Sequence, residues 1–173
     1  YGFYNYKTEL TWIKKCLKYR KNSYIYSYLD LLCDMKKYKD VIKTLENYRV
    51  KASKRGQNMA PVQLMVLGIA YFQEADILNA YANISEANAT ATKLNEEWLQ
   101  YEFALAVKLE KFDEAINVGQ FLVFVNPEKK SYWKQLSGVY YGSESEELSL
   151  AGLELAYEND VLDKEKDYID FFE

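Results

Sequence analysis

The segment LMVLGIAYFQEADILNAYANISEA, residues 64–87, decides the fold. Its first half places apolar or small residues at positions 64, 67, 68, 71 and 72, which is the spacing of one face of an α-helix. Its second half repeats helical spacing with Ala80, Ile84 and Ala87. Small side chains at such positions let two helices approach closely, so the segment predicts two short antiparallel helices joined by a turn.

Three positions of this hairpin recur at the same two intervals along the chain. The intervals are 35 and then 34 residues for each of three series, which are Gly68, Phe103, Ser137; Ala80, Ala115, Ser149; and Ala87, Leu122, Ala156. Phe103 and Leu122 are large where the pattern favours a small residue. The repeat resembles the tetratricopeptide repeat (TPR), a helix–turn–helix of about 34 residues. The resemblance implies an all-α fold, a right-handed superhelical solenoid of antiparallel helix hairpins.

The register predicts a single solenoid domain over residues 1–173. Its expected parts are a partial repeat helix at 1–21, a degenerate repeat at 22–57, three repeats at 58–94, 95–128 and 129–162, and a truncated next helix at 163–173. Gly56 is expected to end the second helix of the degenerate repeat, and Pro61 to begin the next helix.

The composition argues against an enzyme. The chain has no histidine, which removes the commonest general base and the commonest metal ligand. It has no phosphate-binding glycine motif and no cluster of metal-ligand type, so we expect no catalytic residue, no cofactor and no metal. Cys16 and Cys33 are read as buried small apolar residues, with a disulfide as the alternative in an oxidising compartment. No apolar run is as long as a membrane span.

Charge is distributed unevenly. Residues 1–58 hold 14 Lys/Arg and 5 Asp/Glu, a net charge of +9, while residues 59–173 hold 8 and 21, a net charge of −13; together these give −4. Two binding surfaces would explain the asymmetry, and so would unevenly solvated helix faces. The two ends could also attract each other head to tail, as in a self-assembling structural unit. A helical-repeat RNA binder is a further alternative, but a nucleic-acid strand following the whole chain would be repelled by the acidic part.

In a TPR stack the first helix of each hairpin lines a concave groove, and the register predicts which residues face it. The residues that we assign to partner binding in this groove are Tyr26, Asp30, Val62, Met65, Ile69, Phe72, Gln100, Lys134 and Tyr141. The Lys/Asn pair with which chaperone-binding TPRs hold a terminal carboxylate is missing, which argues against a receptor of that kind. Four of these residues form an apolar patch (Val62, Met65, Ile69, Phe72), which either anchors a peptide or a helix of a partner or is covered by a neighbouring helix. The leading hypothesis is a non-catalytic protein–protein interaction scaffold.

From Asn58 onward, over about two thirds of the chain, the sequence resembles one TPR group more closely. The segments that carry this are PVQLMVLGIAYFQ at 61–73, NEEWLQYEFALAVKLEKFDEA at 95–115, SYWKQLSGVYY at 131–141 and ELSLAGLELAYENDVLDKEKDY at 147–168. They resemble periplasmic TPR proteins that accompany TonB–ExbB–ExbD systems of proteobacteria. The resemblance implies a periplasmic adaptor in TonB-dependent uptake, whose partner is a TonB-system or cell-envelope protein; a cytoplasmic location is the alternative. Because the sequence starts at Tyr1, without Met or a leader, we expect an excised or processed segment.

Overall fold

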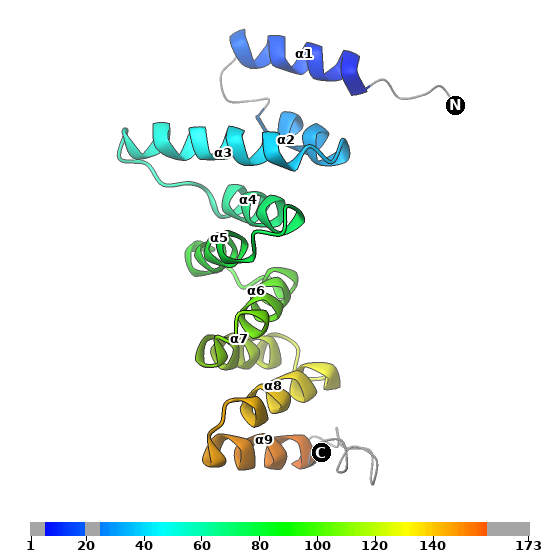
Figure 1. Ribbon diagram of the computed structural model, residues 1–173, viewed down its shortest axis with the longest axis vertical. Coiled ribbons are helices and arrows are strands. Elements are labelled where there is room, and N and C mark those ends of the chain that lie inside the picture. Colours follow the sequence, from blue (N-terminus) through cyan, green and yellow to red (C-terminus); the bar gives the residue numbers. More distant parts are fainter. Residues whose placement is uncertain (1–5, 20–24, 159–173) are drawn as a thin grey trace, which may run out of the picture. The chain divides into compact units, whose positions relative to one another are not determined.

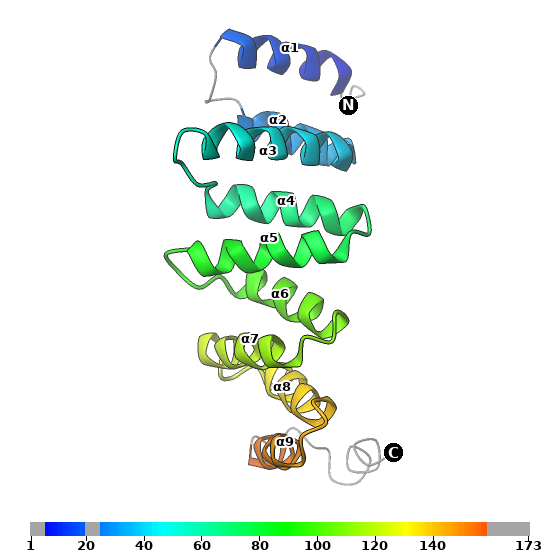
Figure 2. The ribbon, with the colours of Figure 1, turned by 60° about the vertical axis from the view of Figure 1, so that its left-hand side comes forward.

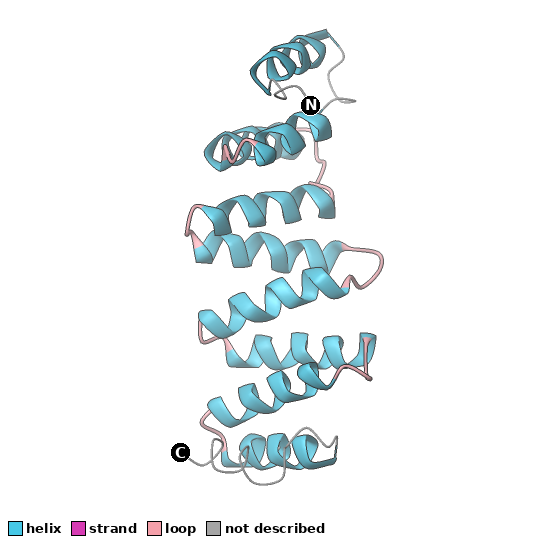
Figure 3. Ribbon diagram, turned by 90° about the vertical axis from the view of Figure 1, so that its right-hand side faces the viewer, coloured by secondary structure: helices cyan, strands magenta, loops and turns pink. Residues whose placement is uncertain are grey.

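The computed structural model describes residues 6–19 and 25–158, and within these ranges it forms α-helices and no strand (Figure 3). The helices are α1 Tyr6–Tyr19, α2 Ile25–Asp34, α3 Tyr38–Ser53, α4 Pro61–Gln73, α5 Ile77–Thr90, α6 Glu96–Lys108, α7 Phe112–Val125, α8 Lys130–Gly142 and α9 Glu146–Glu158. The predicted helix at 163–173 and the side chain of Cys16 lie outside the described part.

The chain divides into two compact units, Tyr1–Asn83 and Ile84–Glu173, and α5 contains the division. Within the first unit α1 packs against α2, α2 against α3 and α3 against α4 (Figures 1 and 2). Within the second unit α6, α7, α8 and α9 pack in the order of the chain. Within each unit these helices therefore pack against the helices next to them in sequence, as in a repeat protein.

The helix ends follow the signals in the sequence. Pro61 is the first residue of α4, where its missing N–H costs nothing. The backbone N–H of Ala60 donates to the side chain of Gln63 at 3.0 Å, which further fixes this end. Gly56 adopts a φ of +66° just beyond α3, a conformation that glycine takes without strain. Both expectations for these residues are confirmed.

The nine register positions predict the core well. Eight of them are buried, and Ser149 is half-buried. Ser137, which stands where a small residue is expected, is 0% exposed and donates its hydroxyl to the carbonyl of Trp133 at 2.8 Å. The repeat register of the sequence is thus the packing register of the structure.

The sequence does not reveal how the large ring of Phe103 is accommodated. The structure places Gly119 of α7 against this ring, because a Cβ added at Gly119 would lie 3.1 Å from Phe103 Cε2 and 2.9 Å from Leu136 Cδ1. The small residue that the pattern expects on α6 is therefore found on α7 instead.

The closest approach among these glycines is between α8 and α9. A Cβ added at Gly152 would lie 2.8 Å from Tyr140 Cβ and 2.9 Å from the backbone oxygen of Ser137. Because a backbone atom cannot turn away as a side-chain end can, α9 packs in this position only with glycine at 152.

The turns inside the hairpins share a left-handed backbone conformation that their residue types do not indicate. A non-glycine residue adopts a positive φ in each of them, namely Lys36, Ala75, Glu110 and Glu144. At Ala75 the chain closes the end of α4, with the N–H of Asp76 donating to the carbonyl of Tyr71 at 2.9 Å. This is the bond pattern of a Schellman motif, whose left-handed residue is usually glycine.

Replacing Ala75 by glycine should raise the free energy of unfolding by about 0.5–1 kcal/mol, because it relieves a left-handed conformation that costs about 1–2 kcal/mol in other residues. The control is Ala82→Gly, on an exposed position inside α5, which should lower stability by about 1 kcal/mol. Urea unfolding measures both. An equal loss of stability in Ala75→Gly and Ala82→Gly would contradict the left-handed conformation of Ala75.

Gly152→Ala should lower the free energy of unfolding by about 2 kcal/mol, because the added methyl group collides with the backbone of α8. Gly138→Ala on α8 is the matched control, since a Cβ there meets nothing within 4 Å. We expect it to be neutral or to stabilise by up to about 1 kcal/mol. If thermal unfolding shows a stabilised Gly152→Ala variant, α8 and α9 do not approach as described.

Candidate partner-binding surface

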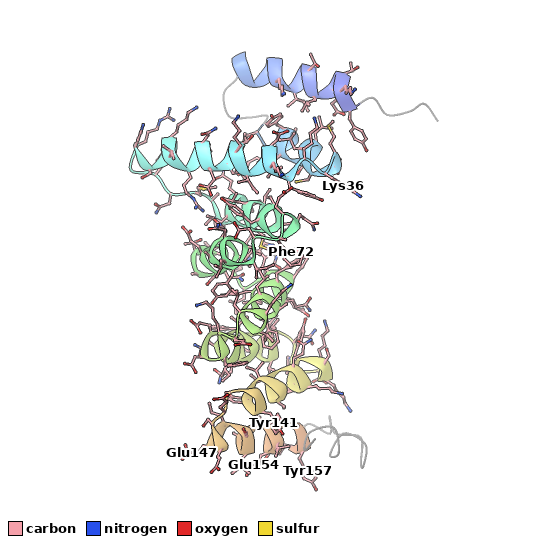
Figure 4. All side chains as sticks on the ribbon, viewed as in Figure 1. Lys36, Phe72, Tyr141, Glu147, Glu154 and Tyr157 are labelled. Carbon is pink, nitrogen blue, oxygen red and sulfur yellow. The ribbon has the colours of Figure 1, made fainter. Side chains whose placement is uncertain are left out.

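The predicted binding residues of the first unit lie on α2 and α4. Tyr26 and Asp30 are exposed on α2. On α4 the exposed residues are Val62, at its beginning, and Phe72, at its end, while Ile69 is half-buried. Figure 4 marks Phe72 on α4. The exposed residues could contact a partner. Their assignment to partner binding remains a prediction.

Met65 differs from the others because it is only 3% exposed. Helix α4 is apolar around most of its circumference, and residues 63, 64, 65, 67, 68 and 70 are all buried. A helix of this kind has neighbours on more than one side. Met65 therefore belongs to the core, and the apolar patch predicted from the sequence is interrupted at its centre.

The second unit contributes α6 and α8. Lys134 and Tyr141 are exposed on α8, and Gln100 is half-buried on α6. Ala104 and Val107 on α6 and Gly138 on α8 are also exposed, and they lie at helical spacing from Gln100, Lys134 and Tyr141, on the same faces of these helices. The exposed side chains on this strip of α6 and α8 are therefore small in the middle and large at one end. We call the exposed residues of α2 and α4 named above the first-helix surface of the first unit, and those of α6 and α8 the first-helix surface of the second unit.

A polar cluster joins the first turns of α6 and α8. The Tyr132 hydroxyl of α8, which is buried, donates to Glu96 of α6 and accepts from Gln100 of α6 and from Lys129. The hydrogen bond from Tyr132 lowers the pKa of the Glu96 carboxyl, and the contact with Tyr132 raises the pKa of the Lys129 amine. The cluster holds the two first helices side by side at this end. It also occupies the amide of Gln100, so this side chain supports the surface and is less free to bind a partner than the sequence suggests.

A second polar cluster lies in the first unit. The Tyr71 hydroxyl of α4 donates to Glu46 of α3 at 2.9 Å, and the Arg49 guanidinium donates to the buried amide oxygen of Asn83 and lies 3.6 Å from Glu46. Burial, followed by the bond to Glu46, raises the pKa of Tyr71 to about 12. Tyr71 therefore remains a neutral donor at physiological pH, and the cluster is structural.

Glu102 is a buried carboxyl group between α5 and α6. It accepts a hydrogen bond from the Asn88 amide at 2.7 Å, and the Ser85 hydroxyl is a second donor. Burial nevertheless raises the pKa of Glu102. Asn88 also donates to the carbonyl of Trp98 at 3.1 Å, so one amide joins the C-terminal half of α5 to α6.

Exposed aromatic side chains also occur on the second helices, where the groove pattern did not look for them. Phe124 is 78% exposed on α7, with Phe121 one turn before it, and Leu150 and Tyr157 are exposed on α9. A helical wheel places Phe124 opposite the buried register positions of α7, and it places Phe121, Leu150 and Tyr157 about a quarter-turn away from the register positions of their helices.

No group of three or more metal-ligand side chains occurs in the part of the chain that the structure describes. Among the same residues no helix is long and apolar enough to cross a membrane.

The two polar carboxyl sites should give pH effects of opposite sign. The raised pKa of Glu102 means that its contribution to stability grows as pH falls from 7 toward its ordinary value. The lowered pKa of Glu96 means that its contribution persists above its ordinary value and is lost at lower pH. As the pH falls from 7 to 5, the free energy of unfolding of the wild type should rise relative to that of Glu102→Gln. Below about pH 4.5 it should fall relative to Glu96→Gln. Parallel pH curves for wild type and Glu102→Gln would contradict the burial of this carboxyl group.

No protein-family model matches the sequence, and no curated protein sequence matches it. Similar solved structures exist. Two crystal structures of MamA superpose with TM-scores of 0.65 and 0.67, each at 16% identity over 90% of this chain, and cover 89% and 83% of the MamA chains. The C-terminal part of a TPR repeat-containing protein from Cytophaga hutchinsonii superposes with a TM-score of 0.55 at 16% identity, over 84% of this chain and 60% of that one.

Likeness at this level of identity shows the fold. The chain is an all-α solenoid of TPR-like helical repeats, as the register predicts.

Proposed function

We propose that this chain is a non-catalytic scaffold that binds a peptide or a helix of a protein partner on the first-helix surface of its second unit. One observation carries the proposal. Phe72, Val107 and Tyr141 occupy the same position of three successive hairpins, 35 and 34 residues apart, and are 40%, 37% and 44% exposed. A large apolar side chain that is kept at the surface in each repeat offers contact area rather than core packing.

The second unit provides the more complete surface. Ala104 and Gly138 are small and exposed, so the backbone or a ring of a partner can come close to α6 and α8 there. Val107 and Tyr141 lie one turn further along their helices and supply apolar contact area, and the Tyr141 ring carries a polar end as well. Lys134, one turn before Gly138, adds positive charge that favours an acidic group in the partner.

Recognition through a terminal carboxylate is not part of the proposal. The clamp that holds such a group needs a cation and an amide one turn apart on a first helix. Here Gln100 is followed by Ala104, and its amide is already engaged by Tyr132. A helix or an internal segment of the partner fits this surface better.

We further propose that the partner belongs to the cell envelope and that the chain acts in the periplasm, in a TonB-dependent uptake system. This finer proposal rests on the resemblance of segments 61–73, 95–115, 131–141 and 147–168 to periplasmic TPR proteins of TonB–ExbB–ExbD systems. Compartment can be tested by fractionation of cells that express the intact protein with its own N-terminus. Recovery in the cytoplasmic fraction would contradict a periplasmic role.

The binding proposal is tested by capture from cell envelopes with purified chain and identification of the partner by mass. Val107→Ser/Tyr141→Ser removes two exposed side chains from α6 and α8. We expect it to reduce the captured partner at least about tenfold, because loss of central apolar contacts typically costs more than about 1.4 kcal/mol. Circular dichroism should be unchanged, since both residues are exposed.

The matched control is Phe121→Ser/Phe124→Ser, which removes two exposed aromatic side chains from α7. Capture should persist in this variant. A partner that is retained by Val107→Ser/Tyr141→Ser and lost by Phe121→Ser/Phe124→Ser would show that the chain binds through its second helices.

A further inference from the structure

Helix α3 carries a basic outer face. Its exposed side chains include Lys39, Lys43, Lys51 and, directly after the helix, Lys54, with Val50, 53% exposed, among them. Lys39 is paired with Glu74 at 3.8 Å, and one acidic residue, Asp40, shares the face. Among the described residues no ion pair involves Lys43, Lys51 or Lys54. The face therefore combines unneutralised positive charge with one exposed apolar side chain.

Helix α9 carries an acidic outer face. Its exposed residues are Glu146, Glu147, Leu150, Glu154, Tyr157 and Glu158, and Figure 4 shows Glu147, Glu154 and Tyr157 projecting from the helix. Leu150 and Tyr157 are 62% and 70% exposed. Within the described ranges, no ion pair involves the glutamates of this face. No basic residue lies on α9 at all.

The two faces match in charge, length and apolar content. Lys43 and Lys54 are 11 positions apart, as are Glu147 and Glu158, which corresponds to about 16 Å at 1.5 Å per residue. If the helices are antiparallel, Lys43 lies near Glu158 and Lys54 near Glu147, and Val50 then comes opposite Ala151, one residue from Leu150. A phosphate backbone or a lipid headgroup would match the lysines but would leave the apolar residues of α9 without a role.

We propose that α3 of one copy binds α9 of a second copy, so that the chain associates head to tail. This surface is separate from the first-helix surface of the second unit, and the proposal does not depend on the proposed function. Because the two faces are different surfaces of one chain, the contact is heterologous and each added copy presents a further free face. Because charge supplies much of the attraction, association should be weak and should disappear at high salt.

Sedimentation velocity of the 173-residue chain, at increasing concentration in about 0.03 M and about 0.5 M NaCl, tests the proposal. At low salt the weight-average mass should rise with concentration above the monomer mass of 20.3 kDa, and at high salt it should stay there. Lys43→Glu/Lys51→Glu and Glu147→Lys/Glu154→Lys each reverse charges on one face. Each variant alone should remain monomeric at low salt.

An equimolar mixture of the two variants is the decisive sample, because the first retains a native α9 and the second a native α3. The mixture should recover association, with a weight-average mass that rises above that of the monomer. Recovery also shows that both variants are folded. The control Lys93→Glu/Lys108→Glu makes the same change in net charge as the α3 variant, on exposed residues that belong to neither face, and should associate like the wild type.

A wild-type chain that is monomeric at every concentration in low salt would overturn the proposal. So would association that persists in either single-face variant, or a mixture of the two that stays monomeric.

Discussion

The close approach of consecutive helices at positions without a side chain is the constraint on which the second unit depends. Gly152 brings α9 against the backbone of α8, and Gly119 makes room on α7 for Phe103 and Leu136. Such contacts join each helix mainly to its neighbours in sequence, so the stability of the stack is approximately a sum of neighbouring interfaces. A substitution at one of these contacts should weaken one interface and spread no further than the helices that share it.

This packing also decides which residues can meet a partner. A helix with a neighbour on each side keeps only a narrow strip in contact with solvent, and on α6 and α8 that strip carries Ala104, Val107, Gly138 and Tyr141. The hydrogen bonds of Tyr132 to Glu96 and Gln100 fix the two helices relative to each other at one end. The strip is thus organised before any partner arrives, which reduces the entropy that binding must overcome.

Much of the fold could be predicted from the sequence because the repeat register is a strong signal. It predicts the hairpins, the start of α4 at Pro61 and the buried positions from Gly68 to Ala156.

The features that the register could not predict depend on which residues are neighbours in space. The burial of Met65 follows from packing on more than one side of α4, whereas a periodic pattern assigns a helix a single buried face. That the missing side chain of Gly119 makes room for the ring of Phe103 can be predicted only when the two residues are known to be in contact. Left-handed Ala75 and Glu110 carry no turn signature in their residue type.

The candidate site was predicted less completely than the fold. Tyr26, Asp30, Val62, Phe72, Lys134 and Tyr141 are exposed as a binding role requires, whereas Met65 is in the core and Gln100 is held by Tyr132. The charged faces of α3 and α9 were visible only as an excess of positive charge early in the chain and of negative charge later. Helix geometry is needed to show that part of the positive excess lies on one exposed face of α3 and part of the negative excess on one exposed face of α9.

The central claim is that the first-helix surface of the second unit is rigid because its helices are packed between neighbours. Amide hydrogen exchange followed by mass spectrometry tests this directly. We expect α7 and α8, each packed against a helix on both sides, to exchange slowest and with a similar free energy of opening, while residues 91–95 between α5 and α6 exchange fast. Exchange of α8 as fast as that of residues 91–95 would show that the surface is not organised in the free protein.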